Sequence, residues 1–188
     1  MEKQIQKVVD FVLDRKIPHG LGGIFTESPL EIVRAMSRIL SRGSSEFHVE
    51  TVRNLTGKEQ TEQTLNRLLA SGNCTIRSLM ERPDAVLQNT LQTIPTSMRQ
   101  DATSDIFFNL TNKGLADYLS QHPEDLDALY EEALHNLPVN ERDWVFETPN
   151  EEGDPDFHKK EMIASYVNIA MPLKEFLNAL NAQYNDEI

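Results

Sequence analysis

A broad apolar stripe runs through residues 158–184, the last long helical segment that the sequence predicts. Its members recur three or four residues apart, which is the spacing of one face of an α-helix. They are Met162, Ile163, Tyr166, Val167, Ala170, Leu173, Phe176, Leu177 and Leu180. Water disfavours so much exposed apolar surface, so the stripe must be buried against something.

Two explanations of how this stripe is buried remain open. The chain can pack its own core on it, including an amphipathic helix predicted over residues 4–16. Alternatively, a second copy of the chain can cover it, which predicts a homodimer. The predicted dimer interface consists of Ile163, Tyr166, Val167, Leu173, Phe176, Leu177 and Leu180. Pro172 lies inside the stripe and predicts a kink or a split, because proline lacks the backbone N–H that a helix interior needs.

Upstream of residue 124, the sequence predicts helices alternating with short strands. Ser28, Pro29 and Glu31 form a strong helix start, with a capping box and a proline at the first helical position. Helices are predicted over residues 28–43, 49–55, 59–71 and 83–93, with another ending near residue 121 and one opening at residues 122–125. Alternating or aromatic runs predict strands at residues 46–48, 74–79 and 105–110.

Three stretches in this order resemble winged-helix transcriptional regulators. Residues 47–57 (FHVETVRNLTG) resemble the strand and second helix of that family, and residues 61–72 (TEQTLNRLLASG) resemble its third helix. Residues 107–115 (FFNLTNKGL) resemble the strand that closes the wing and starts the next helix. The resemblance covers residues 28–121, about half of the chain.

This resemblance implies a mostly α fold. Its winged helix-turn-helix core would carry a small β-wing and be elaborated by extra N- and C-terminal helices. One departure from the family is an insertion at residues 80–104, between the two predicted wing strands. The wing would have to be elaborated to hold it, unless the second strand is misassigned.

The resemblance also implies a sequence-specific DNA-binding transcriptional regulator that acts as a dimer. The third helix would lie in the major groove and read bases with Gln60, Thr61, Gln63, Asn66 and Arg67. Phosphates would be held by Lys58, Arg77 and Arg99. Glu59 and Glu62 oppose this interpretation, because they place negative charge where a phosphate approaches.

The negative charge of the chain lies in its last third. The formal net charge is −12, yet residues 1–123 contain 14 Lys and Arg and 14 Asp and Glu. Residues 124–188 contain 4 Lys and Arg against 16 Asp and Glu. We therefore predict a neutral part, residues 1–123, followed by an acidic helical part, residues 124–188, in which residues 138–157 form an exposed linker.

This charge distribution keeps a second function open. The protein can be an acidic winged-helix adaptor, or a DNA mimic, that binds another protein through its acidic C-terminal region rather than binding DNA. The face that the predicted third helix presents would then be a solvated surface or a protein contact.

Signals of catalysis and of membrane insertion are absent from the sequence. The five histidines and Cys74 form no recognised metal or nucleophile motif, so we expect no enzyme and no cofactor. Cys74 is predicted to be a small core residue, and residues 154–158 an acidic turn that caps the last helix. No apolar run approaches the roughly 18 residues of a membrane span, and the N-terminus lacks a secretory signal pattern, which predicts a cytoplasmic protein.

Overall fold

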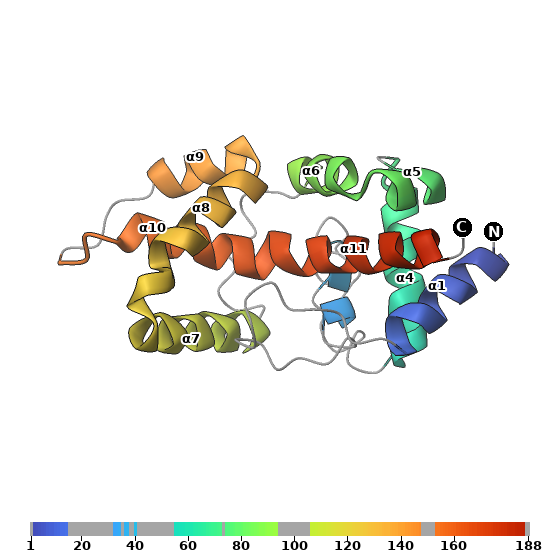
Figure 1. Cartoon of the computed structure of the whole chain (residues 1–188), viewed down its shortest axis with the longest axis horizontal. Coiled ribbons are helices and arrows are strands. Elements are labelled where there is room, and N and C mark those ends of the chain that lie inside the picture. Colours follow the sequence, from blue (N-terminus) through green and yellow to red (C-terminus); the bar gives the residue numbers. More distant parts are fainter. Residues whose placement is uncertain are drawn as a thin grey trace.

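One long helix forms the axis of the molecule in the computed structural model (Figure 1). It consists of α10 (Phe157–Ser165), a π-helical turn η3 (Tyr166–Ala170) and α11 (Met171–Asp186). The structure describes residues 2–14, 32–34, 36–37, 40, 55–72, 74–93, 106–147 and 153–186. At 1.5 Å per residue, the axis spans about 45 Å. This is the helix that the apolar stripe predicted.

Pro172 marks the irregularity in this axis, which takes the form of the π-helical turn. The N–H of Met171 bonds to the carbonyl of Tyr166, five residues back rather than four. Proline has no N–H with which to continue the usual ladder, and a wider turn beside it accommodates the missing bond. The helix therefore continues across Pro172.

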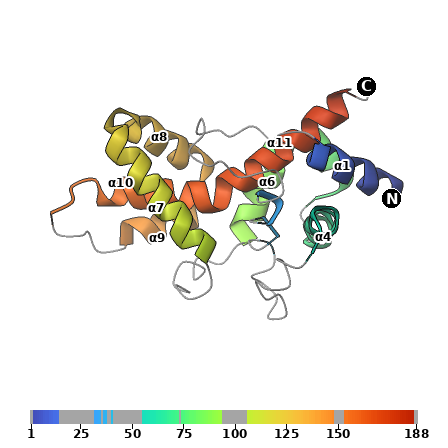
Figure 2. The same cartoon turned by 90° about the horizontal axis from the view of Figure 1, so that it is seen from below.

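Helices from both predicted parts of the chain cover the axis (Figures 1 and 2). Helices α1 (Glu2–Asp14), α5 (Ile76–Glu81) and α6 (Pro83–Thr93) pack on α11, whereas α8 (Leu126–Asn136) and α9 (Val139–Glu147) pack on α10. The axis contributes most of the largest fully buried side chains. The whole set, from the axis and from the helices around it, is Tyr166, Phe176, Met36, Leu68, Leu79, Leu91, Leu137, Met162, Ile163, Ile169, Leu173 and Leu177. Residues 1–123 and 124–188 thus share one core.

Helix α4 (Gly57–Ala70) lies beside α1 and corresponds to the helix predicted over residues 59–71. Thr56 begins it with a capping box: the Thr56 side chain accepts the N–H of Glu59, and the Glu59 carboxylate accepts the backbone N–H of Thr56 at 2.8 Å. Residues 32–34, 36–37 and 40 are also helical, within the segment predicted over residues 28–43. The Ser37 hydroxyl ties that segment to α4 through Thr64.

The predicted strand over residues 74–79 is wrong, because α5 occupies most of it. The Thr75 hydroxyl accepts the N–H of Ser78 at 3.1 Å, and the Ser78 hydroxyl accepts the N–H of Thr75 at 2.7 Å. This reciprocal cap starts a helix where the alternation of polar and apolar residues suggested a strand. A run of six residues is too short for its periodicity to distinguish the two.

The predicted strand over residues 105–110 is also wrong, because residues 106–110 belong to α7 (Ile106–Gln121). Leu115 and Leu119 are buried one turn apart on that helix, which ends before a short 3-10 turn η2 (Pro123–Asp125). The aromatic run at its start extends this helical periodicity backwards, and such short apolar runs suit a buried helix as well as a strand.

These two corrections overturn the predicted winged helix-turn-helix. The part of the chain that the structure describes is mostly helical, as predicted, but it contains no strand, so residues 74–79 and 106–110 do not form the predicted β-wing. The predicted wing insertion at residues 80–104 includes α6, which packs on the axis rather than extending from a wing. The strand predicted at residues 46–48, most of the helix predicted over 49–55 and residues 94–104 of the predicted insertion lie outside the described residues.

Another correction concerns the predicted linker over residues 138–157, which contains α9. The carbonyl of Pro138 accepts the N–H of Arg142 at 3.2 Å and so begins the helix. The fully buried Val145 holds α9 to the rest of the molecule. Among the described helices, none is both long and apolar enough to cross a membrane.

Candidate functional site

Two of the residues predicted to read bases lie inside the protein. Gln60 and Thr61 are fully buried, so the outward orientation predicted for them is wrong. The Gln60 amide donates to the carbonyl of Leu55 at 2.8 Å, and the Thr61 hydroxyl donates to the carbonyl of Gly57 at 2.9 Å. The Gln60 amide thus gives a donor to a carbonyl that precedes α4, and the Thr61 hydroxyl bonds back to the carbonyl four residues earlier within the helix.

The exposed side of α4 carries both signs of charge. Lys58 and Asn66 are exposed as predicted, and Gln63 is half-buried. Glu59 and Glu62 are exposed on the same helix. The hydrogen bonds from the backbone and side chain of Thr56 lower the pKa of Glu59, so its negative charge persists. This side of α4 therefore offers no excess of positive charge to a phosphate backbone.

The two described arginines that were predicted to touch DNA lie on different helices. Arg67 is half-buried, and this burial lowers its pKa from the ordinary value. Arg77 is exposed on α5, where its guanidinium Nε lies 2.8 Å from Glu81 Oε1. Arg99 lies outside the described residues.

The residues predicted to form a dimer interface are buried within a single copy of the chain. Their neighbours are helices of the same chain: α1, α5 and α6 along α11, and α8 and α9 along α10. The buried residues are Ile163, Tyr166, Val167, Leu173, Phe176, Leu177 and Leu180. The stripe is thus packed on the chain's own core, which includes the N-terminal helix α1.

A polar cluster joins α8 to the π-helical turn inside the molecule. The buried Tyr166 hydroxyl donates to Glu132 Oε1 at 2.5 Å, and Lys174 Nζ lies 3.8 Å from the same oxygen. The pKa of Tyr166 is raised, and burial is the largest cause. The hydrogen bond to Glu132 and the negative charges of Glu132 and Glu175 raise it further. The phenol therefore stays a neutral donor, and the cluster fixes α8 on the axis.

The outward side of α9 combines apolar and acidic residues. Val139 is 59% exposed and Phe146 is 52% exposed, and they are the exposed large hydrophobic residues of the described chain. Asp143 and Glu147 are exposed beside them, whereas Arg142 is half-buried. Positions 139, 143, 146 and 147 fall on one helix face, because residues three, four and seven apart are neighbours there. We call these four residues the α9 face.

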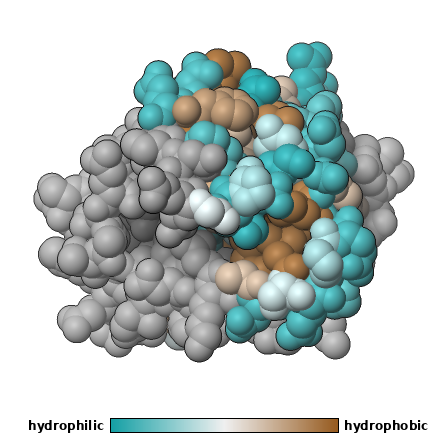
Figure 3. Space-filling model, turned by 90° about the vertical axis from the view of Figure 1, so that its left-hand side faces the viewer, coloured by the Kyte–Doolittle hydropathy of each residue, from teal (hydrophilic) through white to brown (hydrophobic). Residues whose placement is uncertain are grey.

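The aromatic ring of Phe146 contacts a ring of α10. It meets the ring of His158 on α10 edge-on, with centroids 6.2 Å apart, and His158 in turn lies 5.7 Å from the ring of Phe157. Figure 3 views the end of the molecule to which α9 belongs and shows apolar surface among hydrophilic residues there. The α9 face thus leaves an aromatic surface in contact with water.

Both lysines of α10 pair with acids of the same region. Lys159 Nζ lies 2.7 Å from Asp127 Oδ1, a hydrogen bond that raises the pKa of Lys159. Lys160 Nζ lies 2.9 Å from Asp154 Oδ2. Glu131, exposed on α8, has no ion pair with any described residue. Acidic charge consequently dominates the exposed surface here.

An acidic turn precedes the last helix, as predicted, but the side chain of Asp156 makes no capping hydrogen bond to α10. Asp154 Oδ1 accepts the N–H of Asp156 at 3.0 Å, and the Asp154 carbonyl accepts the N–H of Phe157, the first residue of α10. The hydrogen bond from Lys160, then that from Asp156, lowers the pKa of Asp154. The described residues contain no group of three or more His, Cys, Asp and Glu placed to hold a metal ion.

Cys74 packs against the edge of the core, half-buried, as predicted for a small core residue. Its thiol lies 3.1 Å from the carbonyl of Leu68, and burial raises its pKa. A raised pKa keeps the thiol protonated, whereas nucleophilic cysteines are thiolates.

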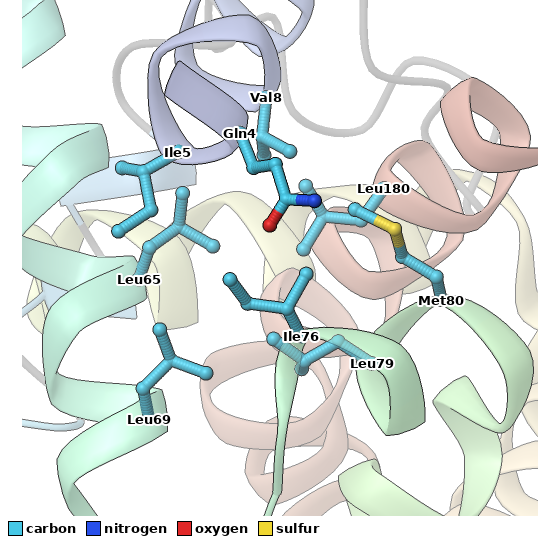
Figure 4. A pocket seen from close by; sticks show the side chains of 9 residues that line it. All are labelled: Gln4, Ile5, Val8, Leu65, Leu69, Ile76, Leu79, Met80 and Leu180. Atoms are coloured by element: carbon cyan, nitrogen blue, oxygen red, sulfur yellow. The ribbon is translucent and has the colours of Figure 1, made fainter. Parts of the chain in front are cut away.

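A small apolar cavity lies where α1, α4, α5 and α11 meet (Figure 4). Its interior of about 10 Å³ has room for roughly one water molecule. The lining residues are Gln4, Ile5, Val8, Leu65, Leu69, Ile76, Leu79, Met80 and Leu180. A cavity so small, whose lining is apolar apart from Gln4, is a packing gap rather than a substrate pocket.

Comparison of the chain with protein-family models, with curated proteins and with solved structures finds no match.

Sequence reasoning missed the α9 face because it treated residues 138–157 as a linker. Two signals could have revealed it. Pro138 suits the residue that precedes a helix, and Val139, Asp143 and Phe146 recur at helical spacing after it. The three prolines and the many acids of the segment outweighed this short pattern.

Proposed function

We propose that this protein is a binding module that docks a partner protein with a basic surface through α8 and α9. The observation that carries the proposal is the outward side of these two helices. Asp143 and Glu147 stand beside exposed apolar residues of α9, Glu131 is exposed on α8, and the two lysines of α10 pair within the region. Charge complementarity steers such encounters, and the apolar contact strengthens them after docking.

The acidic charge of residues 124–188 supports this function over the DNA-binding regulator that the sequence also suggested. DNA-binding proteins neutralise phosphates with a basic surface. The helix assigned to base reading has Gln60 and Thr61 buried and Glu59 and Glu62 exposed. Both observations weaken a role in the major groove.

The proposal can be tested with matched charge variants. The face variant carries Glu131→Gln, Asp143→Asn and Glu147→Gln. The control variant removes three exposed acids elsewhere, with Glu62→Gln, Asp84→Asn and Asp117→Asn. The full chain and both variants would be used to capture proteins and nucleic acid from cells of the source organism at several salt concentrations.

We expect the wild type and the control to retain the same basic protein, and the face variant to lose it. Retention should weaken as salt rises, because salt screens exposed charges. If that protein also binds DNA, added duplex DNA should release it, which would identify DNA mimicry. Equal loss from both variants, or enrichment of particular DNA sequences by the wild type at low salt, would contradict the proposal.

A further inference from the structure

We infer that the α9 face (Val139, Asp143, Phe146 and Glu147) docks a basic amphipathic segment of the partner, with Phe146 as the apolar anchor. This inference rests on the proposed function and gives the chemistry of its partner. The segment would present a short row of apolar side chains with lysine or arginine beside it.

The burial pattern around Phe146 suits a docking anchor. Val145, its neighbour in sequence, is fully buried and fixes the helix, while half of the Phe146 side chain contacts water. The edge-on contact with His158 limits the ring's freedom on one side. An aromatic side chain that is already restrained loses little conformational entropy on binding, and aromatic residues are enriched among the anchors of interfaces.

The spacing of the α9 face defines the segment that it fits. Val139 and Phe146 lie seven residues apart, about 10 Å along the helix. A partner helix repeats its apolar residues at the same two-turn distance, so its row can contact both. Asp143 and Glu147 both lie on one side of the line that joins Val139 to Phe146, and the half-buried Arg142 lies on the other. Lysine or arginine along the acidic side of the apolar row would therefore meet opposite charge.

The inference can be tested with defined peptides and the full chain. The first probe is a helical peptide with leucine at heptad spacing and lysine on its remaining faces. The second replaces every lysine with glutamate, and the third replaces every leucine with serine. Binding to the wild type, Phe146→Ser, Asp143→Asn/Glu147→Gln and the control Glu62→Gln/Asp117→Asn would be measured by fluorescence anisotropy. Circular dichroism would confirm that each variant is folded.

We expect the leucine–lysine peptide to bind the wild type and the control equally. Phe146→Ser should weaken it about tenfold, as loss of a central aromatic anchor does. The double charge variant should weaken it too and reduce its salt dependence, whereas the other two peptides should bind poorly to every form. Equal affinity of Phe146→Ser and the wild type would overturn the inference, as would equal binding of the leucine–lysine and serine–lysine peptides.

The two tests fail in different ways. If the face variant loses a basic partner but Phe146→Ser retains it, the proposed function stands and the apolar anchor is refuted. If the face variant retains every partner, the proposed function fails irrespective of the peptides.

Discussion

Helices α4 and α9 both place polar residues at helical spacing, but their polar groups have different partners. In α4, Gln60 and Thr61 point inward and bond to backbone carbonyls, and Glu59 belongs to a capping box. In α9, Asp143 and Glu147 are exposed next to an exposed aromatic ring. Polar residues that complete a helix contribute to stability, whereas polar residues beside exposed apolar surface suit recognition.

The largest difference between the helices should appear on truncating one inward and one outward side chain. Leu68 of α4 is fully buried, so Leu68→Ala should lower the free energy of unfolding by about 2–5 kcal/mol. Phe146→Ala should lower it by at most about 1 kcal/mol, because the ring is half exposed. Urea unfolding measures both, and similar losses for the two variants would show that Phe146 is a core residue.

A smaller difference in unfolding free energy is expected between variants of two α4 residues that were predicted to read bases. Gln60→Ala should cost about 1–3 kcal/mol of unfolding free energy, since it truncates a fully buried side chain and leaves the half-buried Leu55 carbonyl without its donor. Asn66→Ala, at an exposed position, should change it by about 0.5 kcal/mol or less. Thermal or urea unfolding of the two variants checks this. If Gln60→Ala were neutral, the inward role of that side chain would be refuted.

The sequence predicted the elements whose apolar periodicity is long. Helices α1, α4, α6 and α8 and the axial helix all appear close to where they were expected. It failed at Thr75 and Ser78, where a local capping interaction decides between helix and strand, and at the start of α7, where a short apolar run fits both. Burial of Gln60 depends on tertiary contacts with the segment around Ser37, which no local pattern reveals.

The cap at Thr75 provides the next test, since it replaced a predicted strand. Thr75→Ala should destabilise the protein by about 1 kcal/mol, because the N–H of Ser78 loses its acceptor. Thr75→Ser keeps the hydroxyl and should restore most of that stability. In a strand, stability would depend on the β-branched shape of Thr75 rather than on its hydroxyl. A serine variant as unstable as the alanine variant would therefore contradict the cap.

The smallest effect concerns pH and the capping box of α4. The pKa of Glu59 is lowered from its ordinary value of 4.5 in the folded protein. Its contribution to stability is therefore complete above that value and is lost as the pH falls through the lowered folded pKa. Unfolding measured across the acid range should show a shallower pH dependence for Glu59→Gln than for the wild type. Parallel profiles would show that the box does not stabilise α4.

Photo-crosslinking at one position on each helix compares α4 and α9 most directly. A photoreactive phenylalanine analogue would replace Phe146 in one form of the full chain and Asn66, on the exposed side of α4, in another. Irradiation in cells of the source organism should give a protein adduct from position 146, on a basic segment identified by mass spectrometry, and no DNA adduct from position 66. A DNA adduct from position 66, with none to protein from position 146, would contradict the account.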